Sequence, residues 1–205
     1  MFKKLLICLS LCIVFLNTFA DSPITSTDFF TAYLDVPIVK DKSILDKEAM
    51  IYLYEPSNPI DVKLALINKI GWDHKSHNSE KFLEYIRRNM KYKSRNNFKF
   101  FYFKDHASAD NLICYSYLKA MDNYFYVETA YHYSKLATEK NPSSYAVNLI
   151  SAIIKAQIIT SLESPCELFK ATDDVRRNVN LKKDLRPEAE KLIFEYMDIY
   201  KKGCH

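Results

Sequence analysis

The sequence predicts an all-α fold of about eight or nine helices, packed as successive antiparallel pairs. Three observations favour it: helix-capping residues recur along the chain, strand-like alternation is nearly absent, and the 205 residues include only 2 glycines. Phosphate-binding loops and nucleophile elbows need glycine where the backbone turns at positive φ. The composition therefore disfavours nucleotide-binding enzymes and α/β-hydrolases.

The first segment, residues 1–20, has the features of a secretory signal peptide. Two lysines precede an apolar run from Leu5 to Leu16, and Ala20 supplies a small residue for cleavage. The run is shorter than the roughly 20 residues that cross a bilayer. We therefore expect cleavage after Ala20, no integral membrane span afterwards, and a single all-α domain over residues 21–205. Retention of the segment as an anchor is the alternative.

Local capping residues define the first two helices of that domain. In one, Ser43 with Asp46 can cap a helix that runs through Met50 and Leu53 and stops before Pro56. The next is bounded by Asn58 as its cap and by Gly71, which can end a helix in the left-handed conformation. Both segments carry apolar residues at helical spacing.

A third helix is predicted from a Ser79 cap to Met90, on the helical spacing of its apolar residues. Residues 95–105 then read RNNFKFFYFKD, in which aromatic positions partly alternate with other residues. This stretch is predicted either as a short extended piece or as an aromatic connection.

Three further helices are predicted over residues 109–124, 127–139 and 145–159. The last of them is apolar on nearly every side. Because such a helix has no solvent-facing side, we expect it to lie in the centre of the core.

Residues 111–144 resemble one tetratricopeptide repeat, in which two antiparallel helices occupy about 34 residues. Ala130, Ala137 and Pro142 match the small residues and the exit proline of that pattern. Three positions depart from it: Cys114, Leu118 and Ser134. The resemblance implies a stacked-helix scaffold that binds other polypeptides, and an irregular stack of helical pairs is the alternative.

Two helices close the chain. Ser164, Pro165 and Glu167 fit the cap, the first helical position and the capping-box partner of one helix. Pro187 begins the other, and Gly203 can cap its end.

The cysteines indicate a disulfide. Cys166 lies at the start of the first closing helix and Cys204 just past the end of the second, so an antiparallel arrangement brings them together. We predict that they form a disulfide in an oxidising compartment, the alternative being two separate thiols. Cys114 is predicted as a buried thiol, because no motif supplies the base that a nucleophile needs; His132 is the nearest candidate in sequence.

The charge of the chain argues against a nucleic-acid partner. Removing residues 1–20 takes away 2 of the 29 Lys and Arg residues and no Asp or Glu, which leaves a formal charge of +2. Such a balance cannot neutralise many phosphates. Residues 87–99 are locally basic, which indicates a solvated helix face or a patch for an acidic partner or an anionic lipid.

Neither the histidines nor the paired acids form a recognisable catalytic motif. His74 and His77, near Asp73, could bind a metal only if their segment were helical, and a surface loop is the preferred prediction. Asp173 and Asp174 are adjacent, so on a helix they point about 100° apart and cannot act as a catalytic pair. They are predicted to lie on a solvated face. We expect no catalytic residue, no metal and no cofactor.

The predicted function is therefore an exported, non-catalytic scaffold that binds a protein partner through an aromatic face. The candidate residues are Tyr117, Tyr124, Tyr131 and Tyr133, each of which could instead pack in the core. The bias toward Lys, Asn, Ile and Tyr is typical of an A/T-rich bacterial genome, which predicts a periplasmic or secreted location. The alternative is an exported enzyme or ligand-binding protein that uses the region of His74 and His77.

Overall fold

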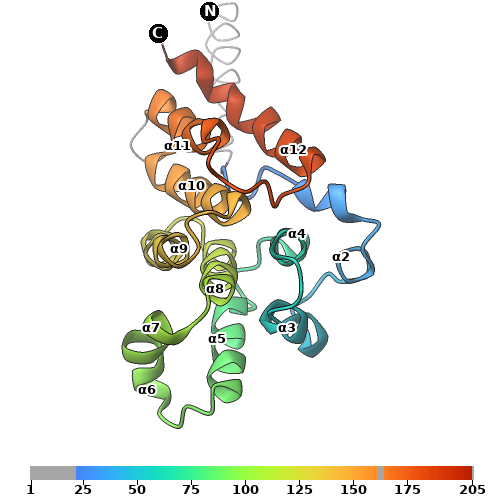
Figure 1. The fold of residues 1–205 in the computed structure, drawn as a ribbon, viewed down its shortest axis with the longest axis vertical. Coiled ribbons are helices and arrows are strands. Elements are labelled where there is room, and N and C mark those ends of the chain that lie inside the picture. The colour runs from blue at the N-terminus through green and yellow to red at the C-terminus, as the bar shows by residue number, and fades with distance from the viewer. Residues whose placement is uncertain (1–21, 161–163, 205) are drawn as a thin grey trace, which may run out of the picture.

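The computed structural model describes residues 22–160 and 164–204, and these residues form helices with no β-strand (Figure 1). The all-α prediction is confirmed, while the predicted signal peptide lies outside the described residues. The longer helices are α3 (Lys47–Tyr54), α4 (Ile60–Ile70), α5 (Asn78–Asn89), α8 (Ala109–Asp122), α9 (Glu128–Lys140), α10 (Tyr145–Thr160), α11 (Pro165–Arg177) and α12 (Pro187–Met197). Shorter helical segments are η1 (Phe29–Tyr33), α2 (Pro37–Asp41), α6 (Arg95–Asn97), η2 (Phe98–Phe103), α7 (Lys104–His106) and η3 (Asp198–Gly203).

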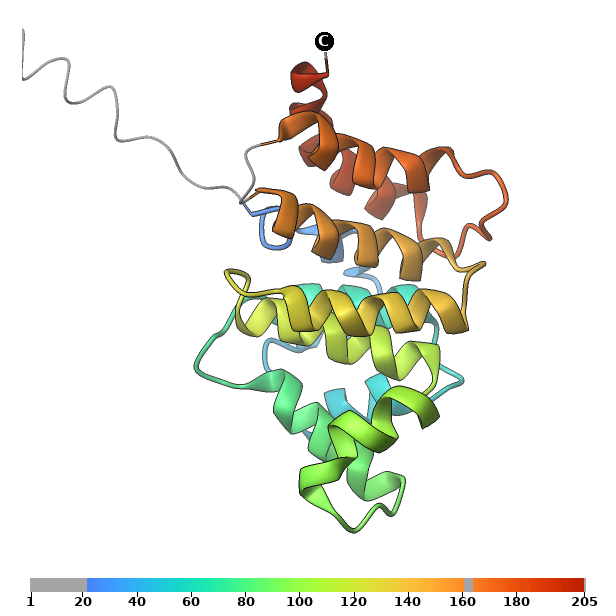
Figure 2. The same ribbon diagram turned by 90° about the vertical axis from the view of Figure 1, so that its left-hand side faces the viewer.

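Consecutive helices in the second half of the chain pack as neighbours. Figure 2 shows α9, α10 and α11 stacked one above another, with α8 beside α9. Helix α10 contacts α4, α8, α9 and α11, and it is buried on most of its surface, as its apolar sequence predicts. The core is one continuous cluster that includes residues from α3 to α12.

Near the beginning of the described chain, η1 makes hydrogen bonds to α4 and to the start of α12. The hydroxyl of Tyr33, in η1, donates to the Asp61 carboxylate at 3.1 Å and accepts from the Arg186 backbone N–H at 3.2 Å. The Arg186 guanidinium lies 4.4 Å from the centre of the Tyr33 ring and donates to Asp35 at 2.6 Å. Because Arg186 immediately precedes α12, these contacts place η1 between α4 and α12.

Local caps agree in part with the prediction for α3, where Asp46 without Ser43 is the cap, and differ for α4. Asp46 caps α3, where its carboxylate accepts from the Ala49 N–H at 2.8 Å. Asn58 does not cap α4, because its side-chain amide donates to the carbonyl of Tyr52 at 2.9 Å. The capping position is taken by Pro59 instead, and Gly71 ends the helix at a φ of 73°.

The cap of α5 was predicted wrongly. Ser79 lies inside the first turn, and the capping carboxylate belongs to Asp122 at the end of α8. Asp122 accepts from the backbone N–H groups of Asn78 and Ser79 at 2.9 Å each, and from the Ser79 hydroxyl at 2.5 Å. This buried carboxylate supplies the acceptors that the free N–H groups of a helix start require.

Residues 95–106 are helical, so the extended alternative was wrong. A π-helical turn, η2, joins the short helices α6 and α7. The wider turn brings positions 98 and 103 toward one side, and both Phe98 and Phe103 are buried with ring centres 5.8 Å apart. The Phe103 ring packs on Tyr115 and Tyr133, which attaches this segment to α8 and α9.

The expected capping box is absent from α11, and of the acidic pair only Asp174 is exposed as predicted. The Ser164 side chain makes no capping hydrogen bond, although Pro165 does begin the helix. Asp173 is buried rather than solvated, because two arginines surround it: Arg176 at 2.5 Å and Arg177 at 2.7 Å. Arg176 also pairs with Asp198 at 2.8 Å, which links α11 to η3.

Candidate protein-binding site

The two C-terminal cysteines form a disulfide in the structure. The Cα atoms of Cys166 and Cys204 are 4.7 Å apart, within the range that a disulfide requires. Cys166 lies in the first turn of α11 and Cys204 follows η3, as the antiparallel arrangement of the two closing helices predicts. The bond fixes the end of the chain to the start of α11.

Gly203 has a different role from the predicted helix cap. It lies in the last turn of η3, and a Cβ atom built on it would be 2.6 Å from the Pro165 Cβ and 3.3 Å from the Cys166 nitrogen. Such separations are shorter than van der Waals contact. Only a residue without a side chain fits where the two segments meet, so Gly203 permits the approach that the disulfide needs.

Two of the four candidate tyrosines belong to the core and cannot contact a partner. Tyr117 is 1% exposed and its hydroxyl accepts from the Asn68 amide at 3.1 Å. Tyr133 is 3% exposed, donates to the Lys99 carbonyl at 3.1 Å, and has its pKa raised to about 12 by burial. The prediction of a binding role was wrong for both, because their faces of α8 and α9 meet other elements rather than solvent.

The other two candidates lie at the surface. Tyr131 is half-buried, and the Lys135 ammonium lies 5.3 Å from its ring centre. Tyr124 is also half-buried, but its ring contacts two exposed aromatic residues: Trp72 at 5.7 Å and Phe125 at 4.3 Å between ring centres. Tyr124 therefore belongs to a larger surface feature.

That feature is an aromatic cluster, which we define as Trp72, His74, Tyr124, Phe125 and Tyr126. The His74 ring stacks on Trp72 at 5.3 Å, so the rings of the first four residues form a continuous chain of contacts. Trp72 is 49% exposed, Phe125 69% and Tyr126 73%. Large apolar side chains grouped on a surface in this way mark an interaction site more often than isolated ones do.

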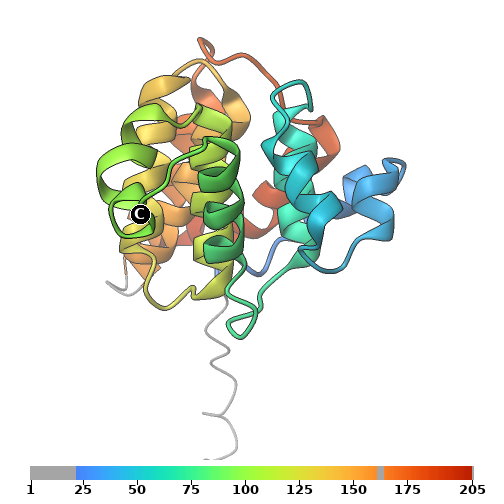
Figure 3. The same ribbon diagram turned by 90° about the horizontal axis from the view of Figure 1, so that it is seen from below.

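The cluster is formed by two loops that one residue holds together. Trp72 and His74 lie in the α4–α5 loop, and the other three members lie in the α8–α9 loop. Figures 2 and 3 show the two loops on the same side of the molecule. Asp122 ends α8, directly before the second loop, and caps α5, directly after the first, so its hydrogen bonds fix both loops at a common point.

The first loop is also ordered internally. The Asp73 carboxylate accepts from the backbone N–H groups of Lys75 at 3.0 Å and Ser76 at 3.2 Å, and from the Ser76 hydroxyl. These bonds, led by the Ser76 hydroxyl, lower the pKa of Asp73. The loop therefore presents Trp72 and His74 from a defined turn.

The structure does not assemble a metal site around His74 and His77. The Asp73 carboxylate is used within the loop, and Glu80 pairs with Lys119 at 3.3 Å. His77 has a φ of 48° in the turn that precedes α5. Within residues 22–160 and 164–204, no group of three or more His, Cys, Asp or Glu side chains could hold a metal ion.

Cys114 is a buried thiol, as predicted. Its side chain is inaccessible, and burial raises its pKa. His132 is exposed on α9, so the imidazole and the thiol lie in different environments and no nucleophile–base pair is formed. Nearby, the fully buried Lys63 pairs with Asp110 at 2.9 Å across the α4–α8 contact.

The chain was compared with protein-family models, with curated proteins and with solved structures, and none of them matches. Among the helices of the described part of the chain, none has both the length and the apolar character needed to cross a membrane.

Sequence reasoning found one of the five cluster residues as a binding aromatic. Trp72, Phe125 and Tyr126 were missed because they lie between helices, where helical periodicity gives no information. A signal was present: three consecutive aromatic residues, 124–126, occupy a helix–helix connection, where polar residues are usual.

Proposed function

We propose that this protein is an exported, non-catalytic helical scaffold that binds another protein through the aromatic cluster. The observation that carries the proposal is the exposure of Trp72, Phe125 and Tyr126 on two loops that are fixed together. Trp and Tyr supply a large share of the binding energy in protein interfaces, because a rigid ring buries much area at a small cost in entropy. A preorganised cluster reduces that cost further.

Export is the second part of the proposal. The signal-peptide features of residues 1–20 and the Cys166–Cys204 disulfide support it, since disulfides persist in the periplasm and outside the cell but rarely in the cytosol. The resemblance of residues 111–144 to a tetratricopeptide repeat supports a binding role, because stacked helical pairs of that family bind polypeptides.

A capture experiment with matched variants tests the binding proposal. The mature chain is used to capture proteins from the periplasmic and secreted fractions of its host, in parallel with Trp72→Ala, Phe125→Ala and Phe101→Ala. Phe101 is 70% exposed on η2, outside the cluster, and so matches Phe125 in type and exposure. We expect one captured protein to be lost with Trp72→Ala and Phe125→Ala and retained with Phe101→Ala. Equal capture by all four chains would refute the role of the cluster.

A further inference from the structure

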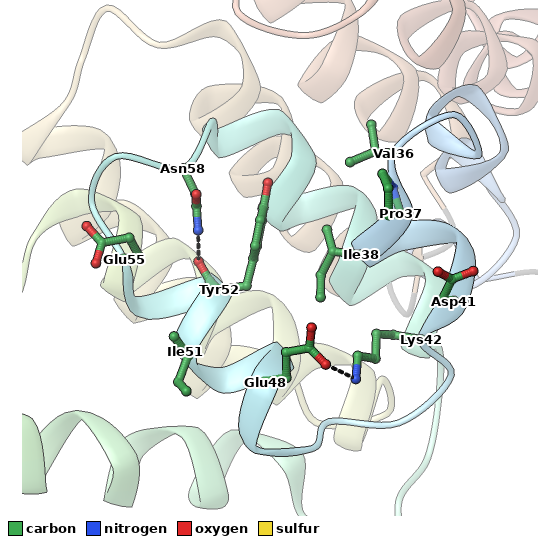
Figure 4. A pocket seen from close by; sticks show the side chains of 10 residues that line it. All are labelled: Val36, Pro37, Ile38, Asp41, Lys42, Glu48, Ile51, Tyr52, Glu55 and Asn58. Carbon is green, nitrogen blue, oxygen red and sulfur yellow. Dashed lines mark hydrogen bonds and ion pairs between the residues drawn. The ribbon is translucent and has the colours of Figure 1, made fainter.

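A second feature, a groove on another part of the molecule, is independent of the aromatic cluster. Helices α2 and α3 each pack against α4, and the space between them is a cavity of about 530 Å³ (Figure 4). Its apolar lining includes Val36 and Ile38 on one side and Ile51 and Tyr52 on the other. A cavity of this size, apolar inside with a few polar groups around it, is typical of a ligand site.

Acidic side chains surround this apolar lining. Glu48, Ile51 and Tyr52 lie on one face of α3 at helical spacing, and Glu55 follows directly after the end of the helix. Asp41 contributes a carboxylate from the end of α2, and Figure 4 shows Asp41 and Glu55 at opposite ends of the groove.

Among the described residues that line the groove, Lys42 is the basic one, and it is already paired. Lys42 bonds to Asp46 at 2.6 Å and to Glu48 at 2.5 Å. Glu55 accepts only local hydrogen bonds, from the backbone and hydroxyl of Ser57 at 3.4 and 3.2 Å. The groove thus combines an apolar centre with exposed carboxylates at both ends, and this pattern favours an occupant that is apolar in the middle and positively charged on either side.

We propose that this groove binds a short peptide segment of a partner protein in which aliphatic side chains lie between basic ones. The aliphatic side chains would be buried against Ile38, Ile51 and Tyr52, and Lys or Arg side chains would pair with Asp41 and Glu55. An acidic segment of the same shape would be repelled by these carboxylates, so charge gives the site its selectivity.

An NMR titration of the ¹⁵N-labelled mature chain tests the proposal. The probes are three acetylated, amidated tetrapeptides: Lys-Leu-Leu-Lys, Gln-Leu-Leu-Gln and Glu-Leu-Leu-Glu. We expect saturable shifts at α2 and α3 with the basic peptide, and affinity about tenfold weaker for the neutral peptide, as two solvent-exposed ion pairs imply. High salt should reduce the difference. Non-saturable shifts, or equal affinity for the basic and acidic peptides, would overturn the proposal.

Titrations of variants then test whether the peptides bind in the groove. The double variant Asp41→Asn, Glu55→Gln should weaken the basic peptide about tenfold and remove its preference over the neutral one. Ile51→Ala should weaken both peptides while keeping the preference. Glu139→Gln removes an exposed carboxylate from α9 and should change nothing. If the double variant binds the basic peptide as the parent chain does, the carboxylates have no role and the proposal is wrong.

The two proposals fail separately. Trp72→Ala should leave the peptide titration unchanged, because the aromatic cluster lies on other elements. In the capture experiment, the double variant Asp41→Asn, Glu55→Gln should still capture the protein that binds through the aromatic cluster.

Discussion

Asp122 and Ser79 connect the end of α8 to the start of α5 through two hydrogen bonds, one from the Ser79 backbone N–H at 2.9 Å and one from its hydroxyl at 2.5 Å. The carboxylate is buried and lies at a helix N-terminus, where the helix dipole favours a negative charge. The same residue fixes the two loops of the aromatic cluster, so local stability and the shape of the binding surface depend on one side chain.

Asp122→Ala should therefore destabilise the protein. Removal of the carboxylate leaves two backbone N–H groups and a hydroxyl without their acceptor, and we expect the free energy of unfolding to fall by about 2–3 kcal/mol. Urea unfolding followed by circular dichroism measures the change. Asp174→Ala, which removes an exposed acid from α11, is the control and should have almost no effect. An equal loss in both variants would contradict the capping role.

Loss of the disulfide should lower the free energy of unfolding by more than Asp122→Ala does. The bond closes a loop with a sequence separation of 38, for which chain entropy predicts about 4 kcal/mol of stabilisation. The double variant Cys166→Ser, Cys204→Ser should unfold at a lower urea concentration than the oxidised parent chain. A reductant should lower the stability of the parent chain but leave the double variant unchanged. A parent chain whose stability does not respond to reductant would show that the bond contributes little.

Gly203→Ala tests the close approach at the same place. Since its Cβ would lie 2.6 Å from the Pro165 Cβ, we expect a loss of about 1–3 kcal/mol through overpacking. The loss should shrink in the background of Cys166→Ser, Cys204→Ser, because the chain end can then move away from α11. Lys202→Ala, one residue earlier and exposed, is the matched control. The prediction fails if the penalty is the same with and without the disulfide.

Glu84 contributes to the free energy of unfolding in a way that depends on pH, and the sign of that dependence can be predicted. The Arg87 guanidinium, followed by that of Arg88, lowers the pKa of Glu84 to about 2 from its ordinary value of 4.5. Because the folded-state pKa is depressed, the stabilisation is fully present above pH 4.5 and is lost as the pH falls toward 2. As the pair is near the surface, we expect Glu84→Gln to cost only about 1 kcal/mol at pH 7.

Urea unfolding of the parent chain and of Glu84→Gln at pH 7, 4 and 2.5 checks this. The difference between the two should narrow step by step as the pH falls. A difference that stays constant, or grows in acid, would mean that the ionised pair is not its source.

Sequence patterns predicted the elements whose signals are local. The Asp46 cap, the Gly71 terminator and the central position of α10 depend on residues within one helix, and periodicity reveals them. The cap of α5 could not be found this way, because its carboxylate comes from a residue 44 positions away.

The aromatic residues likewise show that local sequence patterns do not reveal contacts between distant elements. Burial of Tyr117 and exposure of Phe125 depend on which elements cover each helix face, and an aromatic ring suits a core and an interface equally well. For residues 95–106, partial alternation resembled a strand, while the structure uses a π-helical turn to bury Phe98 and Phe103.

The bonds of Tyr33 to Arg186 bear on the order in which the chain matures. The two residues are 153 positions apart, so the contacts of η1 with the start of α12 form only after nearly the whole polypeptide is available, whereas its contacts with α4 depend on residues much nearer in sequence. In a chain that crosses a membrane from its amino end, η1 would emerge early, and its packing would be complete only when α12 arrives. Until then the Tyr33 ring would lack the Arg186 guanidinium that covers it in the folded chain, and only its contacts with α4 could form.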